Sequence, residues 1–130
     1  PLHSAEELYA TCHVVSLHIP ATAETKGSIN YALLAHMPKG GLLVNTARKE
    51  VINEDELIQF MQERQDFRYV TDIMPAADQK MNELFEGRYF STPKKMGAQT
   101  AEANINAGIA AAKQIVDFVE NGVRRFQVNK

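Results

Sequence analysis

Cysteine and tryptophan are scarce in this 130-residue sequence, which has one cysteine and no tryptophan. With Cys12 alone, no internal disulfide can form, and a reducing, cytoplasmic location is the expectation. No apolar run approaches the roughly 18 residues of a membrane-spanning helix, and the first residues lack the basic and apolar regions of a signal peptide. The formal net charge of −2 gives no reason to expect nucleic acid or an anionic membrane as a partner.

Metal-ligand spacing is missing as well. His3, His13 and His36 have no cysteine or carboxylate placed to complete a ligand set, so no metal site is predicted. What the sequence does contain is 45% hydrophobic residues, which is enough for one modest core.

Strand and helix signals alternate along the first ninety or so residues. Expected strands cover residues 14–19, 42–45, 67–72 and 89–91. Expected helices follow the capping residues Ser4, Asn30 and Asn53 and end near residues 11, 37 and 64. The run 42–45 is short and apolar, as expected when both faces of a parallel sheet are covered. The alternation predicts βαβ units, and therefore an α/β fold with a Rossmann-like, doubly wound parallel sheet.

A long helix is predicted over residues 100–120. It carries spaced apolar residues and small alanines, and Asn121 and Gly122 supply a stop signal. A helix of about twenty residues spans roughly 30 Å, which is more than a small sheet needs for cover. It is either a core helix or a span toward another domain, and the sequence leaves both open.

An arginine, Arg48, follows the end of the expected strand 42–45. Ligands of open α/β sheets bind at the carboxyl ends of the strands, and a guanidinium there is suited to gripping a carboxylate with two hydrogen bonds. The alternative is a surface pair with Glu50 or Glu54. Asp72 ends the next strand and the segment 93–97 follows the one beyond, and both features favour a ligand site.

Four ordered segments carry a family resemblance: residues 14–27, 43–52, 71–73 and 92–103. In this order and spacing the chain resembles the D-isomer-specific 2-hydroxyacid dehydrogenases, and among them the D-3-phosphoglycerate dehydrogenase branch. The resemblance implies that residues 1–104 are the second half of an NAD-binding domain. Residues 105–130 are then an inter-domain helix and tail leading back toward a substrate domain. The G-x-G-x-x-G turn that receives the pyrophosphate does not occur, so the chain alone is expected to be incomplete and inactive.

The resemblance also implies roles for single residues. Arg48 corresponds to the arginine that grips the substrate's carboxylate and 2-oxo oxygen, and Asp72 to an aspartate near the nicotinamide carboxamide. The alternative role for Asp72 is a structural one, as the N-cap of the turn 73–76. Further implied cofactor contacts are His18, Pro20, Thr22, Asn45, Thr46, Ala47, Gly97 and Ala98.

Two residues depart from the usual family site, in which a glutamate orients a histidine acid/base. Lys94 stands in the place of the histidine, and Ala77 in that of the glutamate. A lysine needs no carboxylate to select a tautomer, so the two changes agree chemically, and a minority of phosphoglycerate dehydrogenases carries lysine there. Lys94 is therefore predicted as the acid/base, or Lys95 if the register shifts by one residue. The alternative is a solvated basic turn on a member that has lost its chemistry.

The resemblance thus implies an NAD-dependent oxidoreductase that transfers hydride between nicotinamide and a 2-hydroxy acid, with 3-phosphoglycerate and serine biosynthesis as the first expectation. A homodimer is implied as well. The alternatives are a dehydrogenase for another D-2-hydroxy acid and a catalytically silent NAD-sensing homologue. Substrate identity and the choice of NAD over NADP depend on segments that this sequence does not contain.

Overall fold

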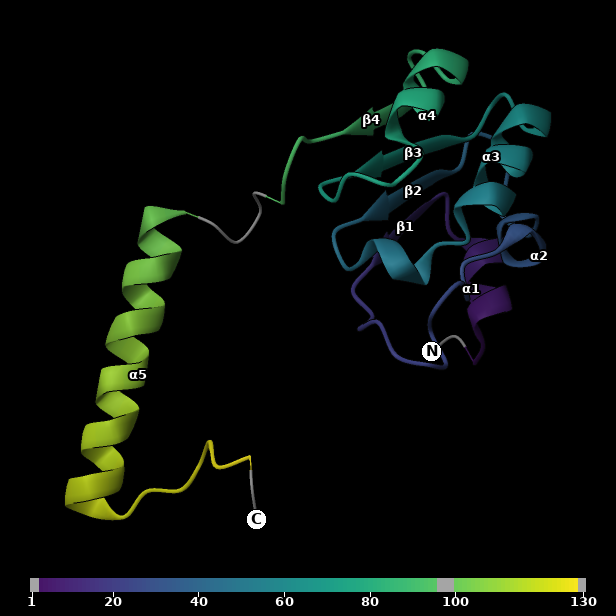
Figure 1. Ribbon diagram of the computed structural model, residues 1–130. Coiled ribbons are helices and arrows are strands. Elements are labelled where there is room, and N and C mark those ends of the chain that lie inside the picture. The colour runs from purple at the N-terminus through teal and green to yellow at the C-terminus, as the bar shows by residue number, and fades with distance from the viewer. Residues whose placement is uncertain (1–2, 96–99, 129–130) are drawn as a thin grey trace. The chain divides into compact units, whose positions relative to one another are not determined.

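The structure, a computed structural model, describes residues 3–95 and 100–128. The chain divides into two compact units, residues 1–95 and 96–130. The first unit holds the sheet with its short helices, and the second holds one long helix (Figure 1).

Four parallel strands form the sheet of the first unit, in the order β1-β2-β3-β4 (Figure 1). The strands are β1 Val14–Leu17, β2 Leu42–Asn45, β3 Arg68–Thr71 and β4 Tyr89–Ser91. The parallel α/β sheet predicted from the alternating pattern is therefore confirmed. Because the strands are parallel, all four carboxyl ends meet at one edge of the sheet, where ligands of such folds bind.

Short helices connect the strands: α1 Ala5–Thr11, α2 Tyr31–Leu34, the 3₁₀ helix η1 Lys49–Val51, α3 Glu54–Glu63 and α4 Asp78–Leu84. The predicted caps form, since Ser4, Asn30 and Asn53 each accept a hydrogen bond from the backbone N–H three residues further on. Helix α4 was not expected. Its N-cap residue is Ala77, which offers no side-chain acceptor, so the sequence carries no start signal there.

The helices cover one face of the sheet. Successive right-handed crossovers that move in one direction place their helices on the same side. The strand residues on that side are buried, namely Val15, Leu17, Leu43, Asn45, Tyr69, Thr71 and Tyr89. On the other face Val14 and Phe90 are each 59% exposed, and Leu42 and Val44 are half-buried. Within this unit, strand β2 is thus covered on one face only, whereas its apolar sequence favoured cover on both.

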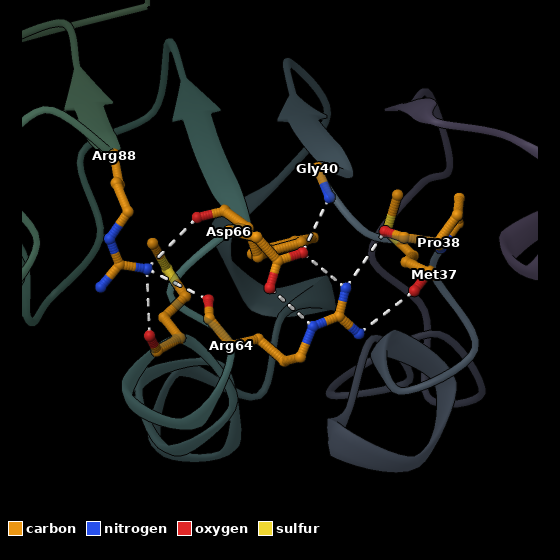
Figure 2. Close-up of polar contacts among 8 residues, drawn as sticks. Met37, Pro38, Gly40, Arg64, Asp66 and Arg88 are labelled. Atoms are coloured by element: carbon orange, nitrogen blue, oxygen red, sulfur yellow. Dashed lines mark hydrogen bonds and ion pairs between the residues drawn. The ribbon is translucent and has the colours of Figure 1, made fainter.

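A bidentate ion pair closes the amino-terminal edge of the sheet. Nε and Nη2 of Arg64 donate to the two carboxylate oxygens of Asp66 at 2.9 and 2.8 Å (Figure 2). Nη1 and Nη2 also donate to the carbonyl oxygens of Met37 and Pro38 at 3.2 and 3.1 Å. Asp66 accepts the N–H of Gly40 at 2.7 Å. The guanidinium, and secondly this N–H, hold the pKa of Asp66 well below its ordinary value.

Arg88, which precedes β4, adds a second tie at this edge (Figure 2). Its Nη1 donates to the carbonyl oxygens of Met61, Arg64 and Phe67 at 3.1, 3.2 and 3.3 Å. Together the two arginines join the loops that lead into β2, β3 and β4.

The second unit consists of α5, Ala101–Asn121, and a short tail. Thr100 caps the helix by accepting the N–H of Ala103, and Gly122 ends it in the left-handed conformation with φ 63°. The long helix predicted over residues 100–120 is therefore present, and none of its side chains is buried. Among the described helices, none has the length and apolar character needed to span a membrane.

Candidate functional site

The turn after β2 is built by the side chain of Asn45. Its Oδ1 accepts the N–H of Ala47 at 3.0 Å, and its Nδ2 donates to the carbonyl oxygen of Arg48 at 3.0 Å. An asparagine that binds the backbone two residues on fixes a turn in this way. Asn45 is 0% exposed, so its side chain forms its hydrogen bonds with other groups of the protein.

A cavity of about 280 Å³ lies at the carboxyl edge of the sheet. It is lined by residues 18–20 from the loop after β1, residues 46–48 from the turn after β2, and Lys95 from the segment after β4. Of the residues singled out from the sequence, His18, Pro20, Thr46, Ala47 and Arg48 are brought together here. Asn45, Thr22 and Asp72 lie outside its lining, and Gly97 and Ala98 fall outside the described residues.

Two cationic side chains meet over one backbone carbonyl in this cavity. Nη1 of Arg48 donates to the carbonyl oxygen of Ala47 at 2.8 Å. Nζ of Lys95 donates to the carbonyl oxygens of Thr46 and Ala47 at 2.9 and 3.4 Å. The arrangement gathers positive charge beside a small cavity, which suits an anionic ligand.

The surface alternative for Arg48 is not observed. In residues 3–95 and 100–128, the ion pair found is that of Arg64 with Asp66, and neither Glu50 nor Glu54 pairs with Arg48. Arg48 is exposed, and within the described residues its guanidinium donates to the adjoining carbonyl of Ala47.

Lys94 is exposed, whereas Lys95 is half-buried. The backbone carbonyl of Lys94 accepts the hydroxyl of Thr92 at 3.0 Å, which fixes the turn. The sequence predicts Lys94 as the acid/base, with Lys95, one residue further on, as the alternative. The geometry favours Lys95, because its amine lies in the cavity.

Asp72 follows β3 at the same edge. Its backbone N–H donates to the carbonyl oxygen of Asn45 at 3.2 Å. Its Oδ1 is buried and, among the described residues, has no hydrogen-bond partner. No capping hydrogen bond between this oxygen and the turn 73–76 is observed among the described residues, where the N–H of Ile73 donates instead to Oγ1 of Thr71 at 3.0 Å. A buried acceptor without a partner is costly, so this oxygen suits a ligand that donates an N–H.

The loop after β1 is held by its own hydroxyls. The N–H of Thr22 donates to Oγ1 of Thr25 at 2.8 Å, and that hydroxyl donates to the carbonyl oxygen of Pro20 at 2.6 Å. His18 is exposed rather than part of the core, and its Nε2 lies 2.9 Å from the hydroxyl of Ser16. The loop is therefore a preformed wall of the cavity.

Glu54 has a role that the sequence did not reveal. Its two carboxylate oxygens accept the N–H groups of Ala76 and Ala77 at 3.0 and 3.1 Å. It thereby fixes the loop after Asp72 around Ala77, the position where the resemblance implies a glutamate. The sequence indicated only a helix start at Glu54, because the partners lie more than twenty positions further on.

Residues 1–93 match the family profile described as D-isomer specific 2-hydroxyacid dehydrogenase, NAD binding domain. The chain is 35% identical to the D-3-phosphoglycerate dehydrogenase of Haemophilus influenzae over 98% of the chain and 32% of that protein. It is 26% identical to that of Bacillus subtilis over 88% of the chain and 22% of that protein. The chain thus spans between about a fifth and a third of these relatives.

Solved structures of dehydrogenases are also similar to this chain. An NAD⁺-bound 3-phosphoglycerate dehydrogenase of Entamoeba histolytica is 53% identical with a TM-score of 0.87, covering 99% of this chain and 42% of that one. A D-lactate dehydrogenase of Aquifex aeolicus, complexed with NAD and lactic acid, has a TM-score of 0.73 at 24% identity, over 98% and 43% of the two chains. The second likeness concerns the fold alone.

Proposed function

The chain belongs to the D-isomer specific 2-hydroxyacid dehydrogenase family, and we propose that residues 1–104 form the second half of its NAD-binding domain. Residues 105–130 are then the helix and tail that lead back toward a substrate domain. The reaction is hydride transfer between NAD and a 2-hydroxy acid, with 3-phosphoglycerate as substrate, in serine biosynthesis. The observation that carries this proposal is the convergence of Arg48 and Lys95 on the carbonyl of Ala47.

The residues present fit the nicotinamide cofactor. A carboxamide donates N–H groups, and Oδ1 of Asp72 is a buried acceptor without a partner among the described residues. The loop with His18, Pro20 and Thr22 is the proposed wall on the adenosine side, with Gly97 and Ala98 as further proposed contacts. When bound, NAD accepts the hydride from the 2-hydroxy carbon or returns it.

Arg48 grips the substrate's carboxylate and 2-oxo oxygen. Its guanidinium now donates to a neutral carbonyl, and a carboxylate is the stronger acceptor because the hydrogen bond is then charge-assisted. A planar grip also orients the substrate for hydride transfer, and such positioning is worth kilocalories.

Lys95 is the proposed acid/base in place of Lys94. As hydride leaves the carbon of the hydroxy acid, the neutral amine takes the proton of its hydroxyl, and in reduction the ammonium returns it. Its support is the position of Nζ in the cavity beside Arg48.

The test is NAD reduction with 3-phosphoglycerate by the holoenzyme that contains this chain. We expect Lys95→Ala to lower kcat by about 10²-fold or more and Lys94→Ala, the matched neighbour, to stay within about twofold. The reverse outcome would assign the proton transfer to Lys94. Arg48→Ala should raise KM and lower kcat together.

A second candidate is a catalytically silent NAD sensor. It is favoured by the loss of both the family histidine and glutamate, at Lys94 and Ala77. NAD binding by calorimetry without turnover on a panel of D-2-hydroxy acids, 3-phosphoglycerate included, would support the sensor. Turnover on a different member of the panel would keep the enzyme and change its substrate.

A cytoplasmic homodimer completes the proposal. Apolar side chains of α5 are exposed, among them Ile105, Ile115 and Val119, and a second subunit would cover such a surface. Sedimentation of the holoenzyme as a monomer at micromolar concentration would contradict the dimer.

A further inference from the structure

The turn that carries Arg48 has every backbone carbonyl engaged. Lys95 donates to the carbonyl oxygens of Thr46 and Ala47, and Arg48 donates to that of Ala47. The carbonyl of Arg48 itself accepts the amide Nδ2 of Asn45 at 3.0 Å. Both cations therefore bond to carbonyls whose direction is set by one buried amide.

Asn45 connects this turn to the neighbouring strand. Its backbone carbonyl accepts the hydroxyl of Thr71 at 2.9 Å and the N–H of Asp72 at 3.2 Å. Its Nδ2 lies 3.4 Å from the hydroxyl of Tyr69, which is 2% exposed. Because Nδ2 donates, the tyrosine oxygen accepts and keeps the amide nitrogen turned toward the carbonyl of Arg48.

We propose that Asn45 is a positioning residue for substrate binding, and that the Tyr69 hydroxyl fixes the orientation of its amide. Asn45 sets the direction of Arg48 through the turn 46–48, instead of contacting the cofactor. This inference rests on the proposed function. It replaces the cofactor contact that the resemblance implied for Asn45 with a contact to the chain's own turn.

A double-mutant cycle tests the coupling. We expect Asn45→Ala to lower kcat/KM with 3-phosphoglycerate about 30-fold when Arg48 is present. In the Arg48→Ala background the loss should be less than threefold, because the effect passes through the guanidinium. The Kd for NAD, measured by calorimetry, should change less than twofold. Equal losses in both backgrounds, or a loss of NAD affinity that matches the loss of kcat/KM, would overturn the proposal.

Two buried tyrosines supply a matched pair should Asn45→Ala fold poorly. Tyr69 and Tyr89 stack with ring centroids 5.9 Å apart, and the Tyr89 hydroxyl donates to Asp78 at 2.6 Å, away from the turn. Tyr69→Phe should lower kcat/KM about threefold to tenfold. Tyr89→Phe should lower only the unfolding midpoint. An unchanged kcat/KM in Tyr69→Phe would show that the Tyr69 hydroxyl does not fix the orientation of the Asn45 amide.

A crystal structure of Asn45→Ala separates this inference from the proposed function. We expect the turn 46–48 to rotate and the Arg48 guanidinium to leave the Ala47 carbonyl. An unmoved turn would refute the positioning role. A wild-type holoenzyme without turnover, together with a rotated turn, would refute the dehydrogenase proposal and leave the positioning of Arg48 standing.

Discussion

The two edges of the sheet use the same kind of side chain in opposite ways. At the amino edge, Arg64 donates to a carboxylate and two carbonyls that belong to two different loops. At the carboxyl edge, the Arg48 guanidinium makes one hydrogen bond to the described part of the chain, to the carbonyl of the residue before it. The first arginine is satisfied by the fold, whereas the second keeps most of its donors available to a ligand.

This difference shows how a chain separates stability from binding. Asp66 is close to Arg64 in sequence, but the carbonyls of Met37 and Pro38 are distant and come together with Arg64 only on folding, so these bonds contribute to the folded state. A bond to the adjoining carbonyl adds little long-range order and is given up at low cost. The carboxyl edge is also where Asp72 keeps a buried oxygen without a partner among the described residues.

The largest expected effect is that of Arg48→Lys. An ammonium lacks the planar fork, so kcat/KM of the holoenzyme should fall about 10³-fold. The unfolding midpoint should stay unchanged, because the side chain bonds only to its neighbour. Steady-state kinetics and thermal unfolding of the same preparation measure both, and a loss below tenfold would count against the carboxylate grip.

Arg64→Lys should show the opposite pattern. Losing the bidentate pair and the carbonyl bonds should lower the free energy of unfolding by about 2 kcal/mol. The kcat/KM per folded molecule should not change. Urea titration gives the first quantity and active-site titration corrects the second. Comparable losses in stability for Arg48→Lys and Arg64→Lys would contradict the claim that only the arginine at the amino edge stabilises the fold.

Asp72→Ala should move binding and stability in opposite directions. The Kd for NAD should rise about tenfold, as expected for one lost hydrogen bond to a charged group. The free energy of unfolding without cofactor should rise by about 1 kcal/mol, because a buried oxygen without a partner is removed. Asp55→Ala, an exposed change, serves as the control. A loss of stability in Asp72→Ala would mean that the carboxylate is needed by the fold.

The smallest expected effect is a pH dependence at the amino edge. The pKa of Asp66 is lowered in the folded state by Arg64, so its contribution is present above the unfolded pKa and is lost as the pH falls through the folded one. Below about pH 4, wild type should therefore lose about 1 kcal/mol more stability than Asp66→Asn. Parallel stability curves for the two proteins would show that the pair contributes nothing.

Local signals made the strands and helix starts predictable. Ser4, Asn30 and Asn53 act within three residues of themselves, and the apolar run of β2 needs no distant partner to be recognised. Helix α4 begins at Ala77 with no cap, so it carried no such signal. The sequence predicted a ligand site at the strand ends, because that position follows from parallel topology, and a cavity lies at this edge.

The finer site was less accessible from sequence. Choosing between Lys94 and Lys95 depends on a single step along an irregular segment, which no periodic pattern fixes. Glu54 and Tyr69 act on partners more than twenty positions away, and pairing at that distance exists only in the folded chain. Asn45 sits in the motif that carries the resemblance, yet its side chain turns inward.

Each loop at the carboxyl edge supplies one part of the site and is anchored by contacts of its own. Hydroxyls hold the loop after β1, Asn45 holds the turn of Arg48, and Glu54 holds the segment beyond Asp72. The turn of Arg48 and the loop of Asp72 are therefore anchored separately, whereas Lys95 shares the carbonyls of Thr46 and Ala47 with the turn. This separate anchoring gives a structural reason why an alanine can stand at position 77: the carboxylate of Glu54, from another helix, already holds the N–H groups of Ala76 and Ala77.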